Sequence, residues 1–175
     1  MVFMKVEETS ISGLFTIELD LIEDDRGSFR EAWHSKKMSE LGLPHFEPIQ
    51  QNISQSKLGV IRGIHAEPWD KYVHVAFGSI FTAIVDLREQ SESYGQYLTF
   101  TLDQSKALFL SKGLGNSFQT TSDLSVYSYL VNSHWQPNLS YQAIAFNDPT
   151  LEIPWPIKNY IVSEKDRNNP TFINE

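Results

Sequence analysis

The stretch Lys71-Tyr72-Val73-His74-Val75-Ala76-Phe77, followed by Gly78 and the run Ser79–Leu87, decides the fold. Both runs are rich in β-branched and aromatic residues, which favour strands, and the glycine between them is a turn signal. The stretch therefore predicts two β-strands that follow each other directly, with no helix between them.

Similar short runs continue in both directions along the chain. They are separated by turn signals and not by helical segments, which is typical of an antiparallel sandwich or barrel rather than a βαβ fold. They lie at Gly13–Asp20, Val60–Ile64, Gln96–Leu102, Ala107–Leu110, Leu124–Val131 and Tyr141–Phe146. Ser35–Gly42 is the one good helix candidate, because a serine can cap its start and a glycine can end it. We expect an all-β fold with at most short helices, in a single domain over residues 1–175.

The composition is that of an ordinary folded protein. Of the 175 residues, 41% are hydrophobic and 21% are charged, which excludes a disordered chain. The absence of cysteine excludes disulfides, a thiol nucleophile and metal sites built on thiolates. A net charge of −8 argues against long-range attraction to nucleic acid. No apolar run approaches the ~20 residues of a membrane span and the first residues do not resemble a signal peptide, so we expect a cytoplasmic protein without a membrane partner.

Strand alternation places Lys71 on the same face as Val73, Val75 and Phe77. If that apolar face is interior, the ammonium group is carried toward the core. A lysine in such a place requires a partner or a function, because an unpaired buried charge is costly.

The same argument groups Tyr127, Tyr129, Val131 and Trp135 on one face of the run Leu124–Trp135. An aromatic wall with polar tips is the kind of lining that ligand pockets use. The alternative is that these are core tyrosines whose hydroxyls are satisfied inside the protein.

His65 is the histidine whose surroundings point most clearly to chemistry. It lies between Arg62 and Lys71, in a segment interrupted by glycine and proline. A short connection between two strands would bring His65 and Lys71 to the same opening. A neighbouring ammonium disfavours the charged imidazole, which keeps the histidine a neutral base at pH 7.

Six short motifs occur in order along the chain. They are Asp25-Arg26-Gly27-Ser28-Phe29-Arg30-Glu31, Gln50-Gln51-Asn52, Val60-Ile61-Arg62-Gly63-Ile64-His65, Val85-Asp86-Leu87-Arg88, Trp155-Pro156 and Ser163-Glu164-Lys165-Asp166. In this order they resemble the landmarks of the dTDP-4-dehydrorhamnose 3,5-epimerase family, over about residues 13–170. The stretch His65–Tyr72, with Tyr129–Asn132 later, is similar to one subgroup of that family.

The resemblance implies a cupin-like jelly roll, usually a homodimer, that acts on a nucleotide-linked 4-keto-6-deoxy sugar without a metal or other cofactor. The reaction would remove a proton from a carbon beside the ketone, at C5 and C3, and return a proton on the opposite face. The expected substrate is dTDP-4-keto-6-deoxy-D-glucose, and the expected product is dTDP-4-keto-L-rhamnose.

The resemblance also implies a role for each matching position. His65 would be the general base, Asp166 the carboxylate that orients it, Lys71 the cation that stabilises the enolate oxygen, and Tyr129 the acid on the other face. Residues that would contact the nucleotide and the diphosphate are Arg26, Phe29, Glu31, Gln50, Asn52, Arg62 and Asn116. Trp135 or His134 would pack against the base.

These residue types suit the chemistry independently of the resemblance. A carbon acid beside a ketone is weak, so the enolate charge needs a fixed cation or hydrogen-bond donor such as Lys71. Inversion needs two proton-transfer groups on opposite faces, and His65 and Tyr129 lie on different predicted strands. A tyrosine with a pKa of about 10 is mostly protonated at neutral pH and can serve as the acid, more readily if a nearby cation lowers that pKa.

A metal site is the competing interpretation of the His65 segment. β-Barrels of the cupin type often hold a metal on a His-x-His pair with later ligands, and this chain offers His65, Glu67 and His74. Because there is no His-x-His pair and Lys71 adds a positive charge, we expect no metal here.

Several alternatives stay open at this stage. Asp86 is a candidate partner for Lys71 or His65, or else a turn residue at a strand end. Asn116 stands where many family members have a histidine, and the loop after His65 is shorter than in many relatives. These two differences leave open which nucleotide the substrate carries and whether C3, C5 or both are inverted. A 3-epimerase, a 5-epimerase, a ketoisomerase and a non-catalytic sugar-binding cupin are the alternative functions, although a binder has no need of His65, Lys71, Tyr129 and Asp166 together.

Overall fold

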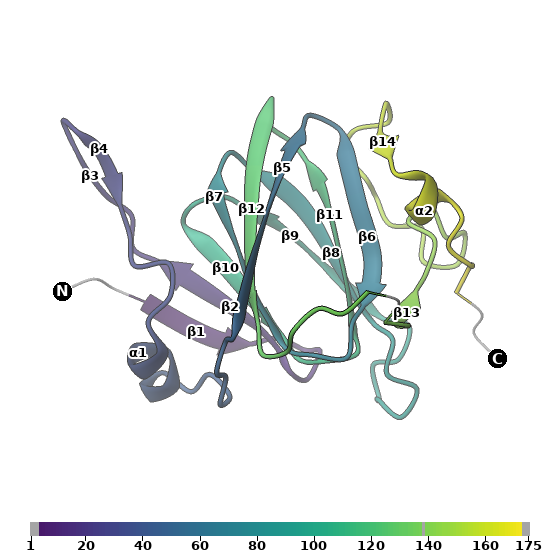
Figure 1. Ribbon diagram of the computed structural model, residues 1–175, viewed down its shortest axis with the longest axis horizontal. Coiled ribbons are helices and arrows are strands. Elements are labelled where there is room, and N and C mark those ends of the chain that lie inside the picture. The colour runs from purple at the N-terminus through teal and green to yellow at the C-terminus, as the bar shows by residue number, and fades with distance from the viewer. Residues whose placement is uncertain (1–3, 138, 173–175) are drawn as a thin grey trace.

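The structure, a computed structural model, describes residues 4–137 and 139–172 of the chain. Within these ranges the chain forms two six-stranded sheets that face each other, a separate two-stranded hairpin and two short helices (Figure 1). The all-β prediction with at most short helices is confirmed.

Each sheet is assembled from strands that are distant in sequence. The first has the order β1-β2-β10-β7-β12-β5, with bounds β1 (Met4–Glu8), β2 (Leu14–Leu19), β10 (Lys106–Leu110), β7 (Lys71–Phe77), β12 (Leu124–Val131) and β5 (Gln50–Lys57). The second has the order β13-β6-β11-β8-β9, with bounds β13 (Gln142–Ala143), β6 (Val60–Ala66), β11 (Leu114–Thr120), β8 (Ile80–Asp86) and β9 (Tyr97–Leu102). These neighbours pair antiparallel, whereas β14 (Ile161–Val162) pairs with β6 in parallel.

Apolar side chains fill the space between the sheets. Val73 and Val75 on β7 meet Ile80 and Ile84 on β8, and all four are at most 1% exposed. Burying an aliphatic side chain of this size contributes about 1.5–3 kcal/mol. These residues belong to one apolar cluster that joins the facing sides of the two sheets.

Segments outside the strands cover the outer faces of both sheets. The helix α1 (Ser35–Glu40) buries Met38 against Tyr72 and Phe109 on the outside of the first sheet. The chain after β13 packs Phe146 and Trp155 against the outside of the second sheet. This second covering segment also leads the chain back to β6.

Lys71 lies on the interior face of β7 with Val73 and Val75, as the alternation predicts, and is 5% exposed. Phe77 departs from the expected pattern and is 56% exposed. The pairing of β7 with β12 shifts register between Val126 and Tyr127, so an extra residue on β7 turns the end of the strand outward.

The helices differ from the sequence-based expectation in two details. The cap of α1 is His34, whose Nδ1 accepts a hydrogen bond from the Lys37 amide, and not Ser35, which is the first helical residue. A second helix, α2 (Glu164–Arg167), was not predicted because four residues are too short for a helical pattern.

The strands Met4–Glu8, Gln50–Lys57 and Leu114–Thr120 were also not predicted. Their sequences are rich in polar residues or glycine, which weakens the strand signal. The predicted strand Tyr141–Phe146 is reduced to the two residues of β13. Its last three residues are instead buried as part of the segment that covers the second sheet.

A hairpin of β3 (Ile22–Asp24) and β4 (Gly27–Phe29) projects away from both sheets (Figure 1). All of its strand residues are exposed, including Ile22 and Phe29 at 47% and 61%. Ile22 and Phe29 lie opposite each other in the hairpin, and neither belongs to an apolar core cluster of the described residues.

Candidate active site

A cavity of about 510 Å³ is lined by strands of both sheets. This volume lies in the range of sites that enclose small ligands. The second sheet contributes residues of β6, β11 and β14, and the first contributes residues of β5, β7 and β12. The lining includes Arg62, His65, Glu67, Lys71, Asn116, Tyr127, Tyr129, Trp135, Tyr141 and Asp166.

His65 and Asp166 form a short polar contact at the cavity wall. The His65 Nε2 and Asp166 Oδ1 atoms are 2.6 Å apart, and the Asp166 side chain is 7% exposed. Burial acts to raise the pKa of Asp166, but its hydrogen bonds and the charge of His65 outweigh burial and lower that pKa overall. The carboxylate therefore stays ionised and can stabilise a proton on the imidazole.

The C-terminal segment delivers Asp166 to this position. The strand β14 pairs with the start of β6, and Ser163 then caps α2 by accepting a hydrogen bond from the Asp166 amide. Asp166 Oδ2 also accepts a hydrogen bond from the Gly63 amide at 3.4 Å. In the sequence, Glu164 to Arg167 has the composition of a solvated charged run, whereas in the structure the Asp166 carboxylate of this run is buried.

Arg62 and His65 both face the cavity although they are three residues apart. In a regular strand they would point to opposite faces. The pairing of β6 with β11 shifts register here, since Asn116 pairs with His65 and Phe118 pairs with Arg62. A β-bulge of this kind re-aims a side chain and is not visible in the sequence pattern.

Lys71 enters the cavity from the start of β7 and is ion-paired with Glu67. The two side chains are 6% and 11% exposed. Burial lowers the pKa of Lys71 to about 7, while the carboxylate in contact with it acts in the opposite sense by stabilising the ammonium. Its Nζ atom also lies 5.6 Å from the centre of the Tyr129 ring.

The aromatic wall predicted on β12 lines the cavity. Tyr127 stacks on Phe118 with ring centres 4.4 Å apart, and its hydroxyl accepts a hydrogen bond from Asn116 Nδ2 at 3.0 Å. Burial raises the pKa of Tyr129, and the nearby Arg62 only partly offsets this. Tyr129 is thus held in its protonated form, which a proton donor requires.

The polar residues of β5 lie beside this wall. Asn52 pairs with Tyr129 in the strand register, and its Oδ1 accepts a hydrogen bond from Gln50 Nε2. Gln50 Oε1 in turn accepts a hydrogen bond from the amide of Trp135, whose side chain lines the cavity and is 57% exposed. Arg62 donates from Nε to the Ser56 hydroxyl at 3.1 Å. Arg62 and Trp135 line the cavity, whereas Gln50 and Ser56 hold these two residues by hydrogen bonds from outside its lining.

Five residues expected to contact substrate are not part of the cavity lining in the described chain: Arg26, Phe29, Glu31, Gln50 and Asn52. Arg26 pairs with Asp24 on the projecting hairpin, which also carries Phe29, and Glu31 pairs with Lys37 of α1. Gln50 and Asn52 lie on β5, and Gln50 binds the amide of Trp135, which does line the cavity.

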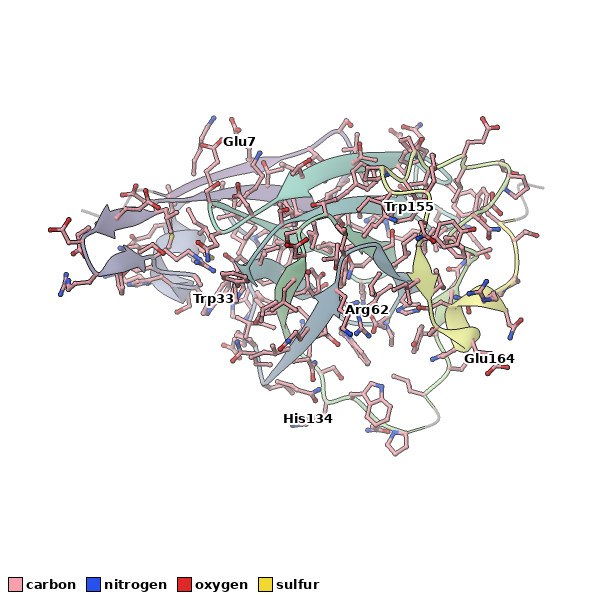
Figure 2. The ribbon with its side chains drawn as sticks, turned by 90° about the horizontal axis from the view of Figure 1, so that it is seen from above. Glu7, Trp33, Arg62, His134, Trp155 and Glu164 are labelled. Carbon is pink, nitrogen blue, oxygen red and sulfur yellow. The ribbon has the colours of Figure 1, made fainter. Side chains whose placement is uncertain are left out.

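His134 and Asp86 were expected to support the site and do not. His134 is exposed on the loop after β12, away from Arg62 in Figure 2, and the ring that packs edge-on against His65 is Tyr141, with centres 5.7 Å apart. Asp86 is fully buried but is bound by Arg88, Ser91 and Ser93. It organises the turn after β8, so the strand-end alternative is correct.

The three candidate metal ligands His65, Glu67 and His74 do not meet at one place in the described chain. His65 and Glu67 line the cavity, whereas His74 lies beside Tyr72 on the other face of β7, with ring centres 6.1 Å apart. Burial lowers the pKa of His74 to about 4, with a further contribution from Arg30.

Two features of the site were not predicted from the sequence: the contact of Tyr141 with His65, and the pairing of Glu67 with Lys71. Only the i, i+4 spacing of that pair is visible in the sequence.

Comparison with known proteins identifies the family. Residues 8–174 match the family model described as dTDP-4-dehydrorhamnose 3,5-epimerase. The chain belongs to the dTDP-4-dehydrorhamnose 3,5-epimerase family. The protein RmlC homolog of Streptococcus pyogenes serotype M6 is 41% identical over 172 residues, covering 94% of this chain and 87% of that protein.

Solved structures of the family share the fold. RmlC from Streptococcus suis, in complex with dTDP-D-xylose, has a TM-score of 0.93 at 38% identity and covers 97% of this chain and 91% of its own. The epimerase of Legionella pneumophila, in complex with dTDP-4-keto-L-rhamnose, has a TM-score of 0.88 at 30% identity, with coverages of 97% and 93%. The predicted family, its cupin-like jelly-roll fold and its class of enzyme, an isomerase, are confirmed. No helix in the described ranges is long and apolar enough to cross a membrane.

The buried Asp86 cluster predicts a loss of stability and not of chemistry. In Asp86→Asn, Arg88 loses its charged partner, so we expect the free energy of unfolding at pH 7 to fall by about 3 kcal/mol. Burial acts to raise the pKa of Asp86, but its hydrogen bonds outweigh burial and lower that pKa overall. The ionised carboxylate therefore stabilises the folded protein at pH values above the pKa of Asp86 in the unfolded chain. This stabilisation is lost as the pH falls toward the pKa of Asp86 in the folded protein. Urea unfolding should therefore show a smaller difference at pH 3 than at pH 7. The exposed control Asp123→Asn should change stability by less than about 0.5 kcal/mol, and an equal loss in both variants would contradict this account.

Proposed function

We propose that this protein inverts C5 and C3 of dTDP-4-keto-6-deoxy-D-glucose to give dTDP-4-keto-L-rhamnose, through an enolate. The observation that carries the proposal is the placement of a histidine–carboxylate pair and a tyrosine on different sheets around one cavity, with a lysine beside them. The family, and the solved structures of its members in complex with dTDP-D-xylose and dTDP-4-keto-L-rhamnose, support the nucleotide sugar as substrate.

Each group has a role that follows from its surroundings. His65 removes the proton beside the ketone, and the ionised Asp166 holds the ring and stabilises the imidazolium that forms. Lys71 stabilises the negative oxygen of the enolate, because a preorganised cation in a cavity with little water acts strongly on developing charge. Tyr129, protonated and on the opposite sheet, returns a proton to the other face of the sugar.

The outer part of the cavity is suited to the nucleotide end of the substrate. Arg62 can use the N–H groups not bound to Ser56 for a phosphate, since guanidinium groups bind phosphate oxygens well. The exposed ring of Trp135, with Gln50 and Asn52 beside it, offers stacking and hydrogen bonds to a base. We place the reaction in the cytoplasm, because a charged nucleotide diphosphate does not cross a membrane unaided.

The protein acts as a homodimer in this proposal. The residues of the hairpin, Arg26 and Phe29, lie away from their own cavity, so they can contact substrate only in a partner's cavity. The outer face of the first sheet also carries two buried polar atoms without a partner in the described chain, Arg30 Nε and His74 Nδ1, near the exposed Ile53 and Phe77. A second copy of the chain that covered this face would bury these apolar groups. In a dimer with C2 symmetry, each hairpin would then reach the cavity of the other subunit.

The function is tested by solvent exchange. Wild-type protein incubated with dTDP-4-keto-6-deoxy-D-glucose in D₂O should incorporate deuterium at C3 and C5 and form the inverted sugar, as followed by proton NMR. His65→Ala should lose exchange at both carbons by at least about 10²-fold, because the base is gone, while nucleotide binding persists.

Other outcomes separate the alternatives. Exchange and inversion at one carbon only would identify a monofunctional epimerase, and a shifted ketone would identify a ketoisomerase. Activity should also survive exhaustive chelation, since Lys71 is assigned to the enolate. Normal exchange in His65→Ala would overturn the assignment of the base.

Tyr129→Phe separates deprotonation from inversion. The variant keeps His65, Lys71 and the ring, so deuterium should still enter the sugar while its configuration is retained. NMR of the product in D₂O measures both quantities in one sample. A variant that inverts the sugar at the normal rate would show that the acid is a different group and that Tyr129 only lines the wall.

Shared sites are tested by mixing two inactive variants. Arg26→Ala and His65→Ala should each be impaired alone. In a heterodimer, the Arg26→Ala subunit keeps its own His65 and receives Arg26 from the His65→Ala subunit, so one of the two sites has both residues intact. After joint refolding in equal amounts, about one quarter of the wild-type activity should return. If activity does not recover in a sample shown by native mass spectrometry to contain heterodimers, Arg26 does not act in the partner's site.

A further inference from the structure

Glu67 places a second carboxylate inside the cavity, in addition to Asp166. It follows β6 in the sequence, and its side chain is only 11% exposed. Its contact with Lys71 joins residues i and i+4 across the connection from β6 to β7. No proton transfer in the proposed reaction uses this carboxylate, so its burial requires another explanation.

The connection that carries Glu67 is fixed at both sides. The Asp70 side chain accepts hydrogen bonds from the Lys112 amide and from Asn132 Nδ2, and the Asp70 amide donates to Asn132 Oδ1. The Glu67 carbonyl accepts a hydrogen bond from the Gly113 amide at 3.4 Å. A short connection held in this way presents the Glu67 carboxylate at a defined place and not as a mobile surface charge.

The charge of the Glu67 carboxylate affects the protonation state of Lys71. A lysine buried to this extent loses its proton readily, and a neutral amine would not stabilise an enolate oxygen. An ionised carboxylate within about 4–6 Å favours the ammonium and shifts its pKa up by about 1–3 units. Glu67 is the carboxylate in contact with Lys71, whereas Asp166 is bound to His65.

We propose that Glu67 is the positioning residue for Lys71, holding the ammonium in the cavity and keeping it charged until the enolate forms. This rests on the proposed function for the role of Lys71 and adds the group that sets its charge. The carboxylate also limits the positive charge next to His65, so the base remains able to accept a proton.

The remaining titratable groups around the cavity do not replace Glu67 in this role. The groups that line it with Lys71 are Arg62 and His65 on β6, Tyr127 and Tyr129 on β12, Tyr141 on the loop before β13, and Asp166 on α2. Of these, Asp166 is the acidic group that is ionised at neutral pH, and its charge is opposed by His65. The removal of Glu67 would thus leave Lys71 to the effect of burial.

The test is Glu67→Gln, which keeps the size of the side chain and removes its charge. In the free protein, NMR titration of the Lys71 Nζ signal, assigned with Lys71→Arg, should show a midpoint lower by about one pH unit or more. With the nucleotide sugar in D₂O, activity requires the ammonium, so the alkaline limb of the exchange rate should move down by the same amount. The control Glu164→Gln removes an exposed carboxylate beside the site and should leave both curves in place.

The two readouts keep the two proposals apart. Absence of exchange in the wild-type protein would overturn the proposed function, while the Lys71 titration would still decide whether Glu67 sets the charge. An unchanged Lys71 midpoint in folded Glu67→Gln would overturn the role of Glu67. A uniform loss of activity at every pH, with no shift of the limb, would make Glu67 a structural residue and would equally overturn it.

Discussion

The hydrogen bond between His65 and Asp166 is the contact on which the site depends. It joins residues 101 positions apart in the sequence, on β6 and α2. It requires the parallel pairing of β14 with β6, and that pairing requires the preceding segment to cover the second sheet. The apolar cluster on that outer face therefore helps to hold the carboxylate of Asp166 against the imidazole.

Two carboxylates are paired with basic groups in the cavity. Asp166 on α2 is bound to His65 of β6 in the second sheet, and Glu67 is paired with Lys71 at the start of β7 in the first sheet. This pairing reduces the desolvation penalty of placing four ionisable groups in a partly closed space. In a chain with a net charge of −8, Arg62 has no ion pair among the described residues, so its guanidinium is an attractive point for the anionic diphosphate of the proposed substrate.

The sequence was sufficient for the fold class, for the interior face of β7 and for the tyrosines of β12, because regular alternation determines which side chains face inward. It was not sufficient where the alternation breaks. The register shift between β6 and β11 brings Arg62 and His65 to one side, and the shift beside Phe77 turns that ring outward. The burial of Asp166 and the contact of Tyr141 with His65 arise from long-range packing, which a local pattern does not encode.

The position of Asp166 on α2 affects how the protein is made in the cell. A ribosome must synthesise the chain as far as residue 166 before the carboxylate bound to His65 exists, and all of β1 to β13 emerges earlier. A polypeptide released at residue 160 would lack that carboxylate whatever else it had folded. In the proposed mechanism, such a truncated product would lack the group that stabilises protonated His65, so its proton transfer would be impaired.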